Sequence, residues 1–192
     1  MEPYSPSYLF STPKAKLKTN NKYPTEEPTA MTDHWRSIVQ QRRSRQLAAI
    51  PASWRLPPST TSSQSTLETI RSCGILTPEE LQWTETTDIS DLLSRLASRE
   101  ISSVQLTTAF CKRAAIAQQL IKCLTEIFFD KALARAKELD EHLARTGKVV
   151  GPLHGLPVSV KDRFDVEGFD TTVGTLASIL PGVILEMGIL TH

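Results

Sequence analysis

The chain has 192 residues, a length suited to one domain of ordinary size. Its 22 basic and 21 acidic residues nearly cancel, so there is no strong positive field to indicate nucleic acid as a partner. No apolar run reaches the roughly 18 residues of a membrane span, so we predict no membrane partner and a cytoplasmic location. The three cysteines lack Cys-x-x-Cys spacing and the four histidines are unpaired, which predicts neither disulfides nor a metal site.

Residues 1–30 differ in composition from the rest of the chain. They contain five prolines and several lysines without an apolar face, which is typical of a disordered extension. The segment lacks the apolar core of a secretory signal, and a transit peptide is a weaker alternative because arginine and amphipathic periodicity are absent. Met31 is an alternative natural start of the protein.

Residues 31–84 are predicted to form a helical arm and linker. A helix over 33–50 carries Trp35, Ile38, Val39 and Arg42 along one stripe. Its arginines leave open a nucleic-acid or membrane arm, but a helix packed on its own domain is favoured. A stretch rich in proline, serine and threonine then forms a linker, followed by a short helix over 67–73 and another that begins at Pro78.

Residues 85–178 alternate between helical and strand-like patterns. Helical spacing over 88–98 places Ile89, Leu92, Leu93 and Leu96 on one face. Ser102 and Gln105 form a capping box for a helix whose predicted buried stripe is Leu106, Phe110, Ala114, Ala117 and Ile121. A strand over 124–129 and a helix capped by Asp130 and ended by Gly147 follow, with Cys111 and Cys123 as small core residues. This order predicts an α/β fold.

The segment 151–162 (GPLHGLPVSVKD) concentrates two glycines and two prolines immediately before an apolar alternation. That density predicts a tight turn, and the residues after it predict a strand with Val158 and Val160 on one face and Ser159 and Lys161 on the other. A lysine desolvated by apolar neighbours can lose its proton and activate a serine hydroxyl. From spacing alone, a solvated surface lysine is the commoner outcome.

This segment, with FDVEG at 164–168 and TTVG at 171–174, resembles the first signature block of the amidase signature family. The runs at 107–120, 124–129 and 132–140 resemble its fungal acetamidase and general amidase branch, and the resemblance extends over about 33–178. It implies the N-terminal portion of the amidase signature fold, a mixed sheet flanked by helices that is incomplete here. Residues 85–178 would be part of the core, 31–84 an arm wrapped on it, and 179–192 an atypical tail.

The resemblance further implies that Lys161 is the catalytic base of a Ser–cis-Ser–Lys triad. This triad hydrolyses the C–N bond of a small linear carboxamide through an acyl-enzyme, without metal or cofactor. The family's two serines lie in a Gly/Ser-rich segment downstream of the lysine, and these 192 residues contain no Gly-flanked serine pair. We therefore predict a chain truncated before both serines and inactive by itself. The alternative is a non-catalytic fragment or interaction module, with self-association through an exposed sheet edge.

For the residues near Lys161 we predict structural rather than catalytic roles. Asp162 is expected to accept backbone or turn hydrogen bonds, Arg163 to be exposed and His154 to support the Gly-Pro turn. A Ser159–Lys161 dyad is disfavoured because no oxyanion donors are evident.

Overall fold

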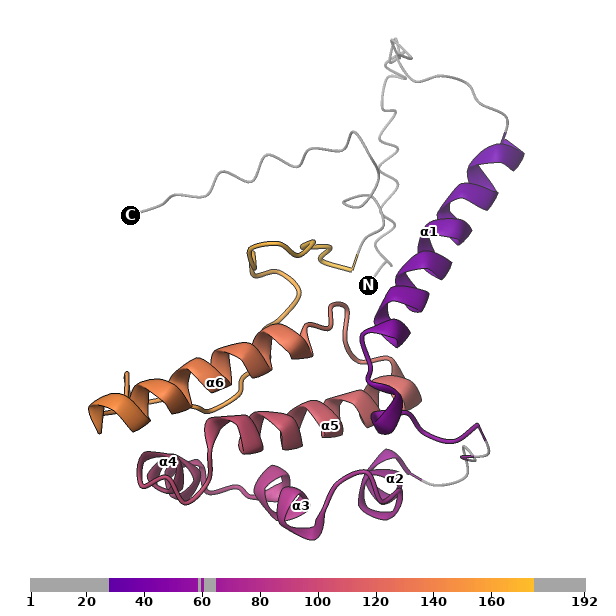
Figure 1. Cartoon of the computed structure of the whole chain (residues 1–192). Helices are drawn as coiled ribbons and strands as arrows, with labels where there is room; N and C mark the ends of the chain where they lie inside the picture. The colour runs from indigo at the N-terminus through magenta and orange to yellow at the C-terminus, as the bar shows by residue number, and fades with distance from the viewer. Residues whose placement is uncertain (1–27, 59, 61–64, 175–192) are drawn as a thin grey trace, which may run out of the picture.

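The computed structural model describes residues 28–58, 60 and 65–174 (Figure 1). Residues 1–27 of the predicted extension and the whole predicted tail at 179–192 lie outside this part. The described elements are all helical: α1 Pro28–Ala48, the 3-10 helix η1 Ala52–Trp54, α2 Thr66–Ser72, α3 Pro78–Glu85, α4 Ile89–Ala97, α5 Ser103–Ile121 and α6 Phe129–Thr146. The arm helix predicted over 33–50 is therefore confirmed, and it begins five residues earlier.

Helix α5 is the element against which most others pack. It contacts α6, α3, α2 and η1, and it lies between α6 on one side and α2, α3 and α4 on the other (Figure 1). Two apolar clusters surround it, each joining residues of several helices. The first contains Trp83, Leu92, Leu96, Ile101, Leu106 and Ala109, and the second contains Ile70, Leu76 and Ile116.

Local hydrogen bonds fix where several helices begin. The predicted capping box of α5 is confirmed, because the Ser102 hydroxyl accepts from the Gln105 N–H and Gln105 accepts from the Ser102 N–H. Matching boxes begin α2 and α3. The predicted cap at Asp130 is wrong: α6 begins at Phe129, which places Asp130 inside the first turn, and Phe128 at the cap makes no side-chain hydrogen bond. Gly147 ends α6 in the left-handed conformation, as predicted.

The predicted buried stripe of α5 is only partly correct. Leu106 is buried, but Ile121 is 59% exposed, whereas Ala115, Ile116 and Gln118 are buried instead. Because helices cover α5 from two sides, its buried surface is wider than the single stripe that an amphipathic surface helix would show. Ile89 in α4 is likewise exposed, so the start of that predicted face is wrong.

The two cysteines near α5 differ in environment. Cys111 is buried, and burial raises the pKa of its thiol to about 11, as expected for a small core residue. Cys123 is exposed, so its predicted core position is wrong.

No strand forms among the described residues, so the mixed sheet predicted around 124–129 and 158–161 is not found there. In the first segment, side chains occupy the backbone groups that a neighbouring strand would need. The Leu124 N–H donates to Gln118 Oε1 at 2.6 Å, and Gln46 Nε2 donates to the carbonyls of Leu124 and Thr125 at 3.2 and 2.8 Å. Because the described part has no sheet, self-association through a sheet edge stays a prediction.

The N-terminus of α5 is held by a residue from α6. The Asp140 carboxylate accepts hydrogen bonds from the N–H groups of Ser103 and Val104 at 2.7 and 3.0 Å. These are two of the N–H groups that a helix start leaves without intrahelical partners, and a negative charge is also favourable there. Asp140 thus fixes the relative position of the two helices that contact each other most extensively.

We predict that Gly155→Ala destabilises the fold by about 2–4 kcal/mol, from a positive φ together with overpacking. Gly155 has φ +76°, and a Cβ atom built on it would lie 2.4 Å from Ser103 Oγ. Gly151→Ala is the matched control, because no atom lies within 4 Å of its added Cβ. Urea unfolding followed by circular dichroism measures both variants, and equal stabilities would contradict the close approach.

Candidate functional site

The segment after α6 turns back along that helix (Figure 1), and its sequence passes through two successive turns before Lys161. The His154 N–H donates to the Gly151 carbonyl and the Leu156 N–H to the Leu153 carbonyl, both at 3.2 Å. Leu156 packs against the cluster that contains Leu96 and Leu106. The predicted Gly-Pro turn is therefore present, and its far end is anchored in the core.

His154 is buried within this turn, in keeping with its predicted supporting role. Its Nδ1 accepts a hydrogen bond from the Val150 N–H at 3.3 Å, so in the neutral ring the proton lies on Nε2. Burial lowers the pKa of His154, although the nearby Asp140 carboxylate opposes this effect. The neutral imidazole is therefore the favoured form.

Ser103, Asp140 and His154 combine the residue types of a hydrolytic triad, but their contacts serve structure. Asp140 uses both carboxylate oxygens on backbone N–H groups of α5, and His154 Nδ1 already accepts from the backbone. Ser103 is 1% exposed, which leaves no room for a substrate at its hydroxyl. The hydrogen bonds of Asp140 and His154 therefore hold the start of α5 and the turn.

Lys161 is exposed and begins a tight turn. Its carbonyl accepts hydrogen bonds from the N–H groups of Arg163 and Phe164 at 2.7 and 3.1 Å. Val158 and Val160 are 71% and 54% exposed, so neither face of the predicted 158–161 strand is covered by the described residues. Period-two alternation produces a half-buried strand only when a neighbouring strand and a core are available. A desolvated Lys161 amine therefore stays a prediction.

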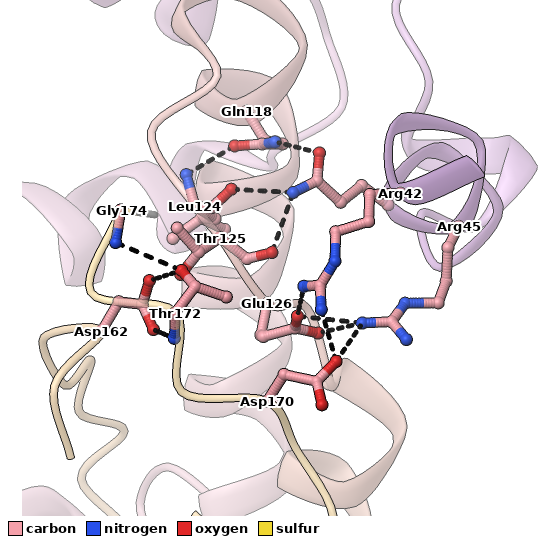
Figure 2. A network of polar contacts seen from close by, with 11 residues as sticks. Arg42, Arg45, Gln118, Leu124, Thr125, Glu126, Asp162, Asp170, Thr172 and Gly174 are labelled. Atoms are coloured by element: carbon pink, nitrogen blue, oxygen red, sulfur yellow. Dashed lines mark hydrogen bonds and ion pairs between the residues drawn. The ribbon is translucent and has the colours of Figure 1, made fainter. Parts of the chain in front are cut away.

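Asp162 closes residues 162–174 into a loop. Its Oδ1 accepts from the Thr172 N–H at 3.0 Å, its Oδ2 accepts from the Thr172 hydroxyl, and that hydroxyl accepts from the Gly174 N–H at 3.3 Å (Figure 2). Burial raises the pKa of Asp162, but the hydrogen bonds from Thr172, Gly174 and Thr125 together outweigh it and leave the pKa below its usual value. The predicted turn hydrogen bonds of Asp162 are confirmed, and Arg163 is exposed as predicted.

Four charged residues join α1 to this loop. The Arg42 guanidinium donates to Glu126 at 2.5 Å and also to Asp170, while Arg45 donates to the two oxygens of Glu126 at 2.9 and 2.8 Å (Figure 2). The side chains of Arg42 and Glu126 are only 16% and 12% exposed. Sequence reasoning placed Arg42 on an apolar stripe and missed this cluster, because its members are up to 128 positions apart.

Two adjoining cavities lie beside the charged cluster. The smaller, about 270 Å³, is lined partly by Arg45, Glu126 and Asp170. The larger, about 520 Å³, is lined partly by the aromatic residues Trp54, Phe128, Phe129 and Phe169. Lys161 lines neither cavity. Within the described part of the chain, no group of three or more His, Cys, Asp or Glu residues is arranged to hold a metal ion, and no helix is long and apolar enough to cross a membrane.

Comparison with known proteins gives the class to which this geometry corresponds. Residues 105–179 match the family model described as Amidase, which confirms the resemblance to the amidase signature family. The match includes the Gly-Pro turn, Lys161 and the loop closed by Asp162.

Particular relatives support the fungal branch. The chain is 44% identical over 151 residues to a protein named putative amidase kk1C from Curvularia clavata. The aligned region covers 77% of this chain and 27% of the relative. It is also 44% identical over 147 residues to the acetamidase of Emericella nidulans, with 77% of this chain and 26% of the relative covered. A solved fatty acid amide hydrolase matches with a TM-score of 0.71 at 31% identity, over 83% of this chain and 29% of that one. The chain thus spans little more than a quarter of the length of these proteins.

We predict that Asp162→Asn lowers the free energy of unfolding near neutral pH by about 1 kcal/mol, because a charged acceptor is lost. The pKa of Asp162 is lowered in the folded state, so its stabilisation is present above the unfolded value near 3.9 and is lost as the pH falls through the folded value. The difference between the variant and the original protein should therefore shrink below about pH 4. Denaturant unfolding across pH 3–7 measures this.

The matched control is Glu167→Gln, which makes the same change of charge at an exposed position of the same loop. A constant difference down to pH 3 for Asp162→Asn, or an equal effect of Glu167→Gln, would show that the Asp162 carboxylate does not stabilise the loop.

Proposed function

We propose that this chain is the Lys161-bearing part of an amidase that hydrolyses the C–N bond of a small linear carboxamide. The observation that supports this most directly is the 151–162 motif, which lies inside the region matching the Amidase family. The motif contains the Gly-Pro turn, and a second turn begins at Lys161. A relative that shares 44% identity over 147 residues is named acetamidase, which supports a short aliphatic amide as the substrate class.

In the proposed reaction, the neutral amine of Lys161 takes a proton from a first serine hydroxyl, which in turn takes the proton of a second serine. The second serine attacks the amide carbon, the C–N bond breaks as the leaving nitrogen is protonated, and water hydrolyses the resulting ester. Both serines belong to the Gly/Ser-rich segment of the family, which has no counterpart in these 192 residues. This chain would supply the base, and a polypeptide region with that segment would supply the nucleophile and the oxyanion donors.

The environment of Lys161 supports this division. An amine acts as a base only when its neutral form is accessible, and desolvation favours that form. Val158, Val160 and Lys161 are all exposed in this structure, so desolvation of the amine would have to come from the rest of an amidase packing on this segment. The triad is therefore proposed to become competent only when this surface is covered.

A second candidate function is a non-catalytic interaction module. Seven large apolar side chains between 149 and 173 are exposed: Val149, Val150, Leu153, Val158, Val160, Phe164 and Val173. Exposed apolar surface of this kind marks interaction sites or causes aggregation. Size-exclusion chromatography tests the module, since a stable monomer would count against it.

We predict that a chimera carrying this chain's residues 28–174 in place of the aligned segment of the Emericella nidulans acetamidase hydrolyses acetamide. In that chimera, Lys161→Ala and Lys161→Arg should each lower kcat by at least about 1,000-fold, because members of a catalytic unit act together and a guanidinium cannot become neutral. Release of ammonia measures the rate.

The exposed Lys148→Ala variant serves as the control and should keep its activity within about twofold, as surface changes usually do. The 192-residue chain alone should show no turnover. Hydrolysis by that chain which disappears in Lys161→Ala, or full activity of the Lys161→Ala chimera, would contradict the proposed function.

A further inference from the structure

Residues 162–174, which follow Lys161 directly, form a loop held by two contacts. Across the loop, the Asp162 carboxylate accepts hydrogen bonds from the Thr172 N–H and hydroxyl, and Thr172 is buried. Two positions before Thr172, Asp170 pairs with Arg42 of α1. Only one residue separates Asp170 from Thr172, so a displacement of one contact is transmitted to the other through very little backbone.

Arg42 occupies the middle of the second contact. Its guanidinium spans two carboxylates, Glu126 in the segment between α5 and α6 and Asp170 in the loop (Figure 2). Two donors in a planar fork fix direction as well as distance. The Arg42 side chain is largely buried, so water competes weakly for it, whereas Asp170 is 55% exposed.

The segment opposite the loop is also held by the arm and by α5. Gln46, one turn beyond Arg42 on α1, donates to the carbonyls of Leu124 and Thr125. Gln118 of α5 accepts from the Leu124 N–H and donates to Gln46 Oε1 at 3.4 Å. The two residues directly before Glu126 are therefore held in place, and Arg42 connects the loop to this supported segment.

We propose that Arg42 is a positioning residue for Lys161: it clasps Asp170 against Glu126 and so holds the loop that Asp162 closes immediately after the lysine. The arm helix α1 thereby controls the direction in which the amine leaves the chain, from a position 119 residues earlier in the sequence. This inference rests on the proposed function of Lys161. It assigns the arm a task in the reaction in addition to covering the core.

A direct test measures the loop in the 192-residue chain by amide hydrogen exchange. Arg42→Gln should raise the exchange rate of the Thr172 and Gly174 amides by roughly tenfold or more, because local opening no longer requires the clasp to break. Arg43→Gln is the matched control: Arg43 is exposed on the same helix and forms no ion pair among the described residues. Circular dichroism at 222 nm shows whether each variant keeps its helices. Unchanged exchange in a folded Arg42→Gln variant would overturn the proposal.

The second test measures catalysis in the chimera described above. Arg42→Gln should lower kcat by about tenfold or more at unchanged KM, since misplacing a catalytic group by about 1 Å costs up to 100-fold. The pH at which activity rises should not move, because a positioning residue changes geometry at every pH. Arg42→Lys, which keeps the charge but loses the fork, should show an intermediate loss.

Three outcomes separate the failures. If Arg42→Gln exchanged faster but had the same kcat as Arg43→Gln, the clasp would be merely structural. That result would overturn the positioning role. If Arg42→Gln shifted the pH profile and Arg42→Lys did not, the effect would be one of charge. That result would also overturn the positioning role. Full activity in the Lys161→Ala chimera would refute the proposed function instead, and the exchange experiment would still decide whether the clasp exists.

Discussion

The hydrogen bonds between the Asp140 carboxylate and the first N–H groups of α5 are the contact on which the rest of the structure depends. They tie the central helix to α6 at the point where the Gly-Pro turn crosses both. Gly155 lies so close to Ser103 there that a side chain would not fit. Any displacement of α6 relative to α5 would therefore move the turn and the residues that follow it.

From this fixed point, the chain reaches Lys161 with support of two different kinds. Leu156 inserts into the apolar cluster of α4 and α5, and this contact sets where the segment leaves the core. Beyond Lys161 the support is polar and comes from Asp162, Thr172 and the charged cluster around Arg42. An apolar anchor tolerates small shifts, whereas a forked ion pair fixes orientation, so the two supports restrain the segment around Lys161 in different ways.

The sequence predicted several local features correctly because they depend on neighbouring residues, although the cap predicted at Asp130 is wrong. The capping box at Ser102 and Gln105, the end of α6 at Gly147 and the turn bonds of Asp162 all join groups within about ten positions. The face of α5 and the pairing of Arg42 with Glu126 and Asp170 depend on which elements meet in space, which no local pattern encodes. The predicted sheet is not found among the described residues for a related reason: alternation gives a segment strand character, but a partner strand must still provide the hydrogen bonds.

The contacts of Asp162 also bear on how a lysine next to a carboxylate could act as a base. An ion pair between neighbouring side chains favours the protonated amine, the form that cannot accept a proton. Both oxygens of Asp162 are occupied by Thr172, and no ion pair joins Asp162 to Lys161 among the described residues. The Asp162 carboxylate is therefore engaged across the loop with Thr172, whereas Lys161, Val158 and Val160 are all exposed. Asp162 thus closes the loop and, within the part of the chain that the structure describes, forms no ion pair with Lys161, a separation that the proposed lysine base would require.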